Sequence, residues 1–156
     1  MLAVLDLFSG IGGFSLGLKM TGGFRTGAFC EKDKFASQVL AKHWPEVPVH
    51  DDIRTLNPDG FRGVDCIVGG FPCQPWSQAG KQRGVEDDRD LWPEMHRVIT
   101  AARPTWVIGE NVRAFVSQPL GLDRCISDLE AIGYAVQAFI VPAVGVDAPH
   151  RRARCW

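Results

Sequence analysis

The stretch VDCIVGGFPCQPWS, residues 64–77, decides how the rest of this chain is interpreted. Val64–Val68 is a short run rich in apolar residues that predicts a buried strand, and the two glycines after it end that strand. Pro72 and Pro75 restrict the backbone on both sides of Cys73, which places this thiol at the carboxyl end of the strand. In an open α/β sheet, ligands bind at that edge. A buried, unreactive cysteine is the alternative, because free cysteine packs as a small hydrophobic residue.

Length and composition predict a single globular domain. The chain has 156 residues, of which 46% are hydrophobic, so it can form a core. No apolar run approaches the ~20 residues that cross a bilayer. No basic and apolar leader precedes the first strand. We therefore expect a cytoplasmic protein.

The cysteines are scattered along the chain at positions 30, 66, 73, 125 and 155. They form no C-x-x-C pair and have no histidine at zinc spacing, so the sequence predicts no metal site. Disulfides are not expected in a reducing compartment. Cys30, Cys66 and Cys125 lie in apolar runs and are predicted to be unreactive core residues.

Strands and helices alternate along the chain. We expect strands at residues 2–7, 25–31, 47–49, 64–68, 105–109 and 134–141, and helices at 14–20, 33–44, 91–102 and 120–132. A long polar loop spans residues 71–90. The alternation predicts βαβ units and an α/β fold with a mostly parallel sheet. No repeat or linker divides the chain.

A glycine-rich turn, Gly10–Gly13, follows the first predicted strand. Right-handed crossovers place this turn along one edge of the predicted sheet, together with Glu31, Asp52, Cys73 and Glu110. The turn is not the G-x-G-x-x-G dinucleotide motif, because no glycine stands three residues after its second glycine. An acid that follows the second strand, here Glu31, is where such folds bind a ribose. Asp52 is placed to accept a hydrogen bond from an adenine amino group. Each acid alone could be a solvated loop residue, but together they favour a nucleoside-containing ligand.

Five motifs, in order, resemble those of DNA (cytosine-5) methyltransferases. They are DLFSGIGGF at residues 6–14, Glu31 with Asp52, GFPCQ at 70–74, ENV at 110–112 and HRRAR at 150–154, where the family has glutamine in place of the histidine. The loop GKQRG at 80–84 also fits the family. The resemblance runs from Leu2 to the last residue. It implies a Rossmann-like S-adenosylmethionine-dependent methyltransferase fold, with helices on both faces of the sheet.

The resemblance also implies a mechanism. Cys73 is then the nucleophile that adds to C6 of cytosine, which makes C5 reactive towards the methyl group of the cofactor. Glu110 would hydrogen-bond ring N3 and the exocyclic amine, and Asn111 would hold Glu110 in place. Arg154 would lie near the base carbonyl, and Arg152 would orient the loop or contact a phosphate. Double-stranded DNA is the implied partner, and the target base must flip out of the duplex.

The resemblance assigns further contacts by position. The implied S-adenosylmethionine contacts are Asp6, Phe8, Ser9, Gly10, Ile11, Gly12, Gly13, Glu31, Lys32, Asp52, Ile53, Gly70, Pro72 and Leu91. The implied DNA contacts are Gln74, Ser77, Lys81, Arg83 and Arg89. For Phe8, packing within the core remains an alternative. For Trp92, packing of its helix remains an alternative to lining the cofactor pocket. A solvated loop remains an alternative for the basic residues, because the net charge of the chain is −1.

The family continues, after the arginine motif, with a strand between the fifth and sixth strands, a target-recognition domain and a final segment. We therefore expect residues 1–156 to form an incomplete catalytic domain with uncovered apolar surface near its first helix. Such a chain would be marginally stable, would oligomerise, or would need a second polypeptide. A remnant that binds the cofactor or a partner chain without turnover is the alternative function, and an unrelated nucleotide-binding α/β enzyme is a third.

Overall fold

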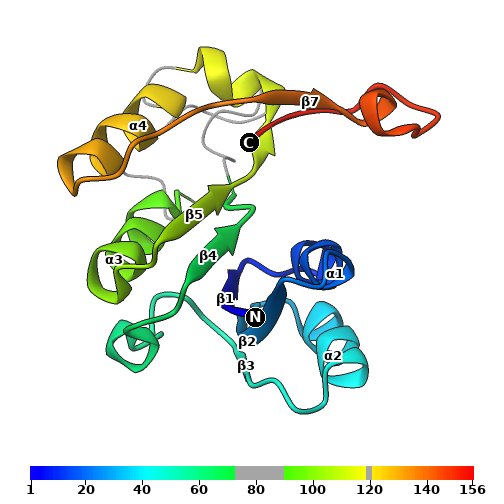
Figure 1. Ribbon diagram of the computed structural model, residues 1–156, viewed down its shortest axis with the longest axis vertical. Coiled ribbons are helices and arrows are strands. Elements are labelled where there is room, and N and C mark those ends of the chain that lie inside the picture. The colour runs from blue at the N-terminus through cyan, green and yellow to red at the C-terminus, as the bar shows by residue number, and fades with distance from the viewer. Residues whose placement is uncertain (73–89, 119–120) are drawn as a thin grey trace. The chain divides into compact units, whose positions relative to one another are not determined.

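The computed structural model describes residues 1–72, 90–118 and 121–156. The chain forms two compact units (Figure 1). The first contains Met1–Gly70 and Arg97–Gly109, and the second contains Phe71–His96 and Glu110–Trp156. In the described parts of the chain, no helix has the length and apolar character that crossing a membrane requires.

The first unit is built on a parallel five-stranded sheet with the order β3-β2-β1-β4-β5. Its strands are β1 (Leu2–Leu7), β2 (Phe24–Cys30), β3 (Val49–His50), β4 (Cys66–Gly69) and β5 (Trp106–Gly109). Leu5 of β1 pairs with Ala28 of β2 and Ile67 of β4. Leu5 and Ile67 have no exposed surface, as expected for a parallel sheet that is covered on both faces.

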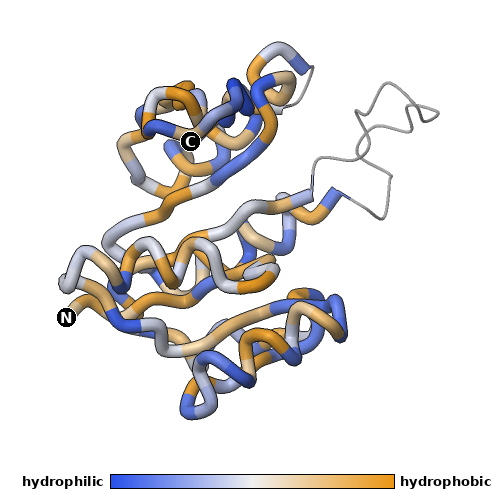
Figure 2. Tube along the Cα trace, turned by 90° about the vertical axis from the view of Figure 1, so that its right-hand side faces the viewer, coloured by the Kyte–Doolittle hydropathy of each residue, from blue (hydrophilic) through white to orange (hydrophobic). Residues whose placement is uncertain are grey.

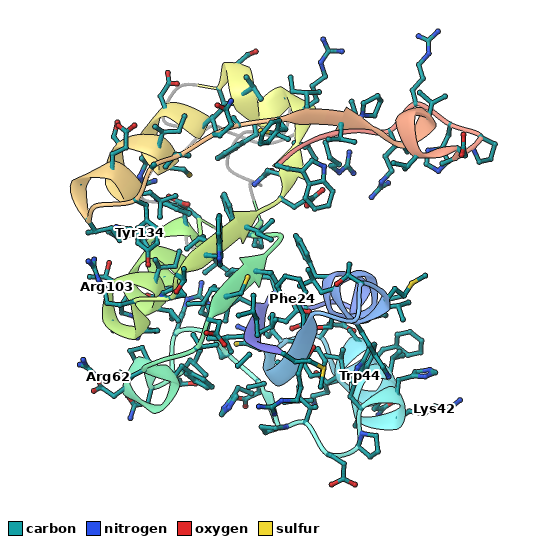
Figure 3. The ribbon with its side chains drawn as sticks, in the orientation of Figure 1. Phe24, Lys42, Trp44, Arg62, Arg103 and Tyr134 are labelled. Atoms are coloured by element: carbon teal, nitrogen blue, oxygen red, sulfur yellow. The ribbon has the colours of Figure 1, made fainter. Side chains whose placement is uncertain are left out.

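Helices supply that cover. They are α1 (Gly13–Met20), α2 (Lys34–His43) and the part of α3 (Trp92–Ala102) that belongs to this unit. α1 and α2 lie on one side of the sheet and α3 on the other (Figure 1). Figure 2 shows hydrophobic and hydrophilic residues along each of these helices. The buried hydrophobic residues are Ala36 and Leu40 in α2 and, in this part of α3, Val98, Ile99 and Ala102. Phe24 packs with Phe14 and Leu18 against the core cluster of Val4, Cys66 and Val68 (Figure 3).

The second helix begins and ends where the sequence predicts. Asp33 is the N-cap of α2, and its side chain accepts a hydrogen bond from the Ala36 N–H at 2.8 Å. This bond satisfies one of the free amides of the first turn. Trp44 is the C-cap residue, and Pro45 follows it. The helix predicted over residues 33–44 is therefore confirmed.

The strand order reverses between β1 and β4. From β1 the chain proceeds outwards to β2 and β3, and from β4 it proceeds in the opposite direction to β5. Such a reversal is the place at which α/β sheets bind ligands. The glycine-rich turn follows β1, Glu31 follows β2, Asp52 lies two residues after β3 and Gly70 follows β4. These residues lie along one sheet edge, as the crossover argument predicts.

The second unit contains a three-stranded antiparallel sheet with the order β6-β8-β7. Its elements are β6 (Asn111–Val112), helix α4 (Leu122–Ala131), β7 (Ile140–Pro142) and β8 (Ala153–Cys155), with 3-10 turns at Arg113–Ser117 and Ala143–Val146. β8 lies between β6 and β7. The resemblance places the strand near Arg154 between the strands expected at 105–109 and 134–141; β7 supplies the second of these neighbours, but β6 takes the place of β5, which belongs to the other sheet.

Two predicted strands differ from the structure. The strand expected at 134–141 is wrong over most of its length, because only Ile140–Pro142 pair with β8. Phe139 and Trp156 exchange backbone hydrogen bonds of 2.8 Å, and the ladder extends no further towards residue 134. The strand expected at 47–49 is instead Val49–His50. Pro48 has no N–H to donate to a ladder, so it contributes only its carbonyl, which accepts from the Phe29 N–H.

Candidate active site

The turn after β1 has an unusual backbone. Phe8, Gly10 and Gly12 have positive φ angles of 53°, 54° and 88°. For a phenylalanine this left-handed conformation is strained, and such strain is concentrated at ligand sites. Ser9 fixes the turn, because its hydroxyl donates to the Asp6 carbonyl at 2.6 Å and its own carbonyl accepts from the Gly12 N–H at 2.9 Å.

The three glycines of this turn differ in the space around them. A Cβ atom on Gly12 would lie 2.7 Å from the ring of Trp44, the C-cap residue of α2 labelled in Figure 3. A Cβ atom on Gly10 or Gly13 would meet nothing within 4 Å. Ile11, between them in sequence, is 62% exposed. The turn is therefore packed against α2 at one glycine and open beside the other two.

Asp6, the next to last residue of β1, is a buried carboxyl group with an incomplete set of partners. It has no exposed surface, and its Oδ2 atom accepts from the Ser15 hydroxyl at 2.6 Å. Its Oδ1 atom is buried and has no hydrogen-bond partner among the described residues. Burial raises the pKa of Asp6 from 3.8 to about 7, against the lowering effect of the Ser15 and Ser9 hydrogen bonds. This edge would therefore favour a ligand that brings a positive charge or a donor.

Glu31 ties the end of β2 to the glycine-rich turn. Its Oε2 atom accepts from the Gly10 N–H at 2.7 Å, and its Oε1 atom accepts from the Asp33 N–H at 2.7 Å. Each carboxylate oxygen has a second lone pair, so the group can still accept from ligand hydroxyls. The predicted ribose site and the predicted loop are thus one connected structure.

Asp52 is also held by neighbouring groups. Its Oδ2 atom lies 3.0 Å from Lys32 Nζ, and its Oδ1 atom accepts from the Arg54 N–H at 3.0 Å. The Arg54 hydrogen bond, followed by Lys32, lowers the pKa of Asp52. Ile53, which follows Asp52, is only 3% exposed, and Gly70 is half-buried at the end of β4.

The donors and acceptors at this edge favour one class of ligand. Three carboxyl groups lie at or just after the ends of neighbouring strands, those of Asp6 within β1, Glu31 after β2 and Asp52 after β3. Lys32 is already paired with Asp52. Carboxylates attract amino and hydroxyl donors and positive charge, whereas they repel phosphate. The edge therefore suits a cationic nucleoside rather than a dinucleotide.

In the second unit, two distant motifs meet through strand pairing. β6 pairs with β8 so that Val112 lies opposite Arg154. Glu110 directly precedes β6, and its Oε1 atom lies 2.7 Å from Arg154 Nε. Both side chains are about a quarter exposed or less, at 25% and 21%. The pairing gives a carboxylate and a guanidinium that are oriented towards each other and remain accessible.

Asn111 is fixed on both sides of its amide. It is 5% exposed, its Nδ2 atom donates to the Phe71 carbonyl at 3.1 Å, and its Oδ1 atom accepts from the Val112 N–H at 2.9 Å. Because buried amides need their hydrogen bonds, this side chain sets the distance between Phe71 and β6. Its contacts are with Phe71 and Val112, and the role of Asn111 in holding Glu110 stays a prediction.

The remaining predicted residues of this unit lie at its surface or near it. Arg152 is exposed, has a φ of 20°, and forms no ion pair among the described residues, so the structure does not bring it to Glu110. Pro72 and Leu91 are half-buried. Trp92 is 4% exposed and packs on Phe71, with ring centroids 5.2 Å apart, in agreement with the packing alternative.

Part of the predicted site lies outside the described residues. The predicted nucleophile Cys73 and the implied DNA contacts Gln74, Ser77, Lys81, Arg83 and Arg89 all fall within residues 73–89. Their roles stay predictions from the sequence.

Comparison with known proteins gives the family. A family model described as C-5 cytosine-specific DNA methylase matches residues 2–156, all of the chain except its first residue. The chain belongs to the C-5 cytosine-specific DNA methylase family. Its resemblance to DNA (cytosine-5) methyltransferases, inferred from five motifs, is thereby confirmed.

Curated members of this family are considerably longer. The chain is 38% identical over 158 residues to the type II methyltransferase M.PspPI of Psychrobacter sp. (strain TA137), covering 97% of this chain and 38% of that protein. It is 36% identical over 158 residues to the type II methyltransferase M2.BsuMI of Bacillus subtilis (strain 168), covering 97% and 40%. The chain thus spans about two fifths of the length of these relatives.

Solved structures confirm the fold class. A crystal structure of a Spodoptera frugiperda DNMT2 mutant superposes with a TM-score of 0.83 at 25% identity, covering 99% of this chain and 48% of that one. The α/β architecture, with its mostly parallel sheet and helices on both faces, is therefore the Rossmann-like methyltransferase fold of the DNA methylase family, shortened relative to these structures.

The motifs of the DNA methylase family did not point to several residues that build the site. Ser15 holds Asp6, and a signal for it exists, because helical spacing places this serine on the buried side of α1 near Phe14 and Leu18. Trp92 and Asp128 are hydrogen-bonded at 2.7 Å although they lie far apart in the sequence. No local pattern connects those two residues, so only the folded chain shows the contact.

Proposed function

We propose that this chain is the catalytic part of a DNA (cytosine-5) methyltransferase, which transfers a methyl group from S-adenosylmethionine to C5 of cytosine in DNA. The observation that carries the proposal is the contact between Glu110 and Arg154, 2.7 Å apart. Two family motifs from different parts of the chain provide these side chains, and the β6–β8 ladder brings them together. An ion pair with no role in a reaction would not require both motifs.

The residues at the first unit's edge fit S-adenosylmethionine, which is a cationic nucleoside without phosphate. Glu31 would accept from the ribose hydroxyls and Asp52 from the adenine amine, while the turn at residues 8–13 and Gly70 would lie beside the cofactor. The free Oδ1 atom of Asp6 supports a cationic ligand nearby. When bound, the cofactor supplies an electrophilic methyl group.

The chain's own residues would prepare the cytosine. The Cys73 thiolate would add to C6, and the electron pair displaced from the C5–C6 bond would move into the ring. Glu110 would hydrogen-bond N3 and offset the developing charge there. C5 would then take the methyl group, and loss of the C5 proton with expulsion of the thiolate would restore the ring and the free cysteine.

Arg154 would hold Glu110 in place and lie near the carbonyl of the base. Its guanidinium holds Glu110 through Nε, and its Nη1 atom donates to the Ala153 carbonyl at 3.1 Å, so its plane is fixed. A fixed guanidinium is a stronger electrostatic element than a mobile one, because it need not reorganise during the reaction. Arg152, which is exposed, suits a phosphate contact better than a contact with the base.

DNA would reach this centre by base flipping, because C6 of a stacked cytosine is inaccessible to a thiolate. Gln74, Ser77, Lys81, Arg83 and Arg89 are the proposed DNA contacts. Their basic members suit the backbone phosphates.

A covalent trapping experiment tests the proposal. The chain is incubated with tritiated cofactor and duplex DNA that contains 5-fluorocytosine, alone and with the C-terminal part of a curated relative. Because fluorine at C5 cannot leave as a proton does, the enzyme–DNA adduct accumulates. We expect an adduct that Cys73→Ser abolishes and Cys125→Ser retains. An adduct that survives Cys73→Ser, or none in either mixture, would refute the proposal.

A further inference from the structure

A polar cluster in the second unit joins α4 to the start of α3. Trp92 Nε1 donates to Asp128 Oδ2 at 2.7 Å. Arg124, one helical turn before Asp128, donates from Nη1 to Asp90 Oδ2 at 2.7 Å. Hydrogen bonds that involve a charged group are stronger than neutral ones. α4 therefore holds residues 90–92 at two points.

Arg124 also orients the acceptor of the indole bond. Its Nε atom lies 3.8 Å from Asp128 Oδ2, and its side chain is 23% exposed. The Asp128 side chain is 38% exposed, so water can solvate it when a partner is lost. Asp90 in turn accepts from the Trp92 N–H at 3.3 Å. A substitution at Asp128 can therefore remove its contact with Trp92 without leaving the Arg124 charge buried and unsolvated.

Trp92 passes this constraint to Phe71. The two ring centroids are 5.2 Å apart, and Phe71 also contacts Phe115 at 5.5 Å. Phe71 is 7% exposed, so its ring has little freedom. Its carbonyl is the acceptor for Asn111 Nδ2 at 3.1 Å. A displaced Phe71 would leave a buried amide without its partner, which is costly.

Asn111 is the first residue of β6, and Glu110 precedes it directly. β6 has only two residues, so its own ladder with β8 fixes it weakly. The contact between Asn111 and Phe71 is therefore a main determinant of where Glu110 lies relative to Arg154. In the sequence, Phe71 stands two residues before residues 73–89 and Asp90 directly follows them. That segment carries the predicted nucleophile.

We infer that Asp128 is a positioning residue for the methyl-transfer reaction. It acts through Trp92, Phe71 and Asn111 on Glu110, and it touches none of the reacting atoms. The inference rests on the proposed function. It assigns a role to α4, a helix that carries none of the five family motifs.

Two conservative substitutions test this path. Trp92→Phe keeps a ring against Phe71 and removes the indole N–H, while Asp128→Asn keeps an acceptor and removes its charge. The single-turnover rate of adduct formation on 5-fluorocytosine DNA is measured at saturating cofactor. We expect each variant to be about tenfold slower, because small misplacements of reacting groups are expensive. The double variant should be no slower than the slower single variant, since both act on one path.

The matched control is Asp59→Asn, which removes an ion pair of 2.8 Å with Arg62 in the first unit. Its rate should equal that of the unsubstituted chain. Cofactor affinity should be the same in all variants. Unchanged rates, losses that multiply in the double variant, or parallel losses of cofactor affinity would overturn the inference.

A second measurement separates this inference from the proposed function. The side-chain amide resonances of 15N-labelled Asn111 should shift in both Trp92→Phe and Asp128→Asn, and not in Asp59→Asn. If the unsubstituted chain forms no adduct, the proposed function fails on its own evidence. If the Asn111 amide does not respond, the path from Asp128 is wrong whatever the adduct shows.

Discussion

At the scale of the residue, Asp6 shows how burial alters the chemistry of a side chain. Its carboxyl group is enclosed by the sheet, and only one of its oxygens has a hydrogen-bond donor among the described residues. Desolvation disfavours the charged form, which raises the pKa of Asp6 to about 7. The folded chain therefore keeps this proton at pH values at which the unfolded chain has lost it.

The free energy of unfolding should consequently fall as pH rises. Between the ordinary pKa of 3.8 and the folded value of about 7, the folded state binds more protons than the unfolded state. The contribution of protonated Asp6 to the free energy of unfolding is fully present below pH 3.8 and is lost as pH rises through 7. Relative to Asp6→Asn, the unsubstituted chain should lose on the order of 4 kcal/mol over this range. Urea denaturation of both proteins from pH 4 to 8 measures it; a difference that does not vary with pH would contradict the prediction.

The cysteines differ in their expected reactivity. Burial raises the pKa of Cys30 to about 12 and that of Cys66 to about 11, and it also raises the pKa of Cys125 and of Cys155. A thiol reagent at pH 8 reacts with thiolates, so these four should stay unmodified in the folded chain. We expect one modified site, lost in Cys73→Ser, as counted by intact mass spectrometry.

Unfolding provides the control for this experiment. In urea, all cysteines should react, and the Cys73→Ser chain should show one site fewer than the unsubstituted chain. Rapid modification of Cys73→Ser under native conditions would show that a buried thiol becomes accessible, and the assignment of the reactive cysteine would then fail.

At the scale of the element, the turn after β1 provides a matched pair of glycines. Both Gly10 and Gly12 have positive φ angles, but only a Cβ atom on Gly12 would collide with Trp44, at 2.7 Å. Gly10→Ala should therefore cost only the left-handed strain, about 1–2 kcal/mol. Gly12→Ala should cost that strain and the displacement of a packed indole, about 2–5 kcal/mol together. Denaturant unfolding compares the two.

Relief of the collision checks this explanation. In a chain with Trp44→Leu, the added Cβ atom at Gly12 should lose its contact with the indole and keep the one with Leu40 Cδ2 at 3.0 Å, so the difference between Gly12→Ala and Gly10→Ala should shrink. The same difference in both backgrounds would mean that the Trp44 ring is not its cause.

The sequence predicts elements well where local chemistry determines them. The apolar runs of β1 and β4, the Asp33 cap of α2 and the glycine-rich turn all depend on residues close together in the chain. The prediction of a strand fails at residues 134–138, whose apolar character is compatible with one. β7 begins only at Ile140, and the backbone hydrogen bonds to the neighbouring segment extend no further than Phe139, which pairs with Trp156. A strand needs a partner, and the position of a partner is a property of the fold.

The site shows the same division. Motifs predict Glu31, Glu110 and Arg154, because the proposed chemistry needs those types of side chain at those places. They do not predict Asp128, whose proposed role rests on its hydrogen bond with Trp92, because many residue pairs can provide the same support. The sequence therefore names residues that would touch ligands more readily than residues that hold them in place.

At the scale of the whole molecule, each unit carries one part of the proposed reaction. The carboxyl groups of the cofactor edge belong to the first unit, and the Glu110–Arg154 pair belongs to the second. Both units also expose large apolar side chains. On α1 these are Leu16 (52%) and Met20 (81%), one turn apart, which confirms the expected apolar surface near the first helix. In the second unit they are Phe139, Ile140, Val144, Val146 and Trp156, each at least 40% exposed.

Surfaces of this kind favour association, because exposed apolar patches are rare on monomers. We expect the chain to self-associate at micromolar concentrations, and Ile140→Thr with Val146→Thr to weaken that association. Both substitutions keep β-branched side chains and so preserve the backbone preference of β7 and of the turn after it. Removing two half-exposed aliphatic groups from an interface should cost about 2 kcal/mol, roughly thirtyfold in the association constant.

Sedimentation velocity over a range of concentrations measures this association. The control is Trp106→Thr, which removes a side chain that is 61% exposed at the start of β5 in the first unit. If association depends on the second unit, the control should associate like the unsubstituted chain, whereas the double variant should not. Equal weakening by the control would place the contact on the first unit, where Leu16 and Met20 become the residues to replace. A chain that stays monomeric throughout would show that these two surfaces are not complementary to themselves, and that their apolar side chains require a different partner.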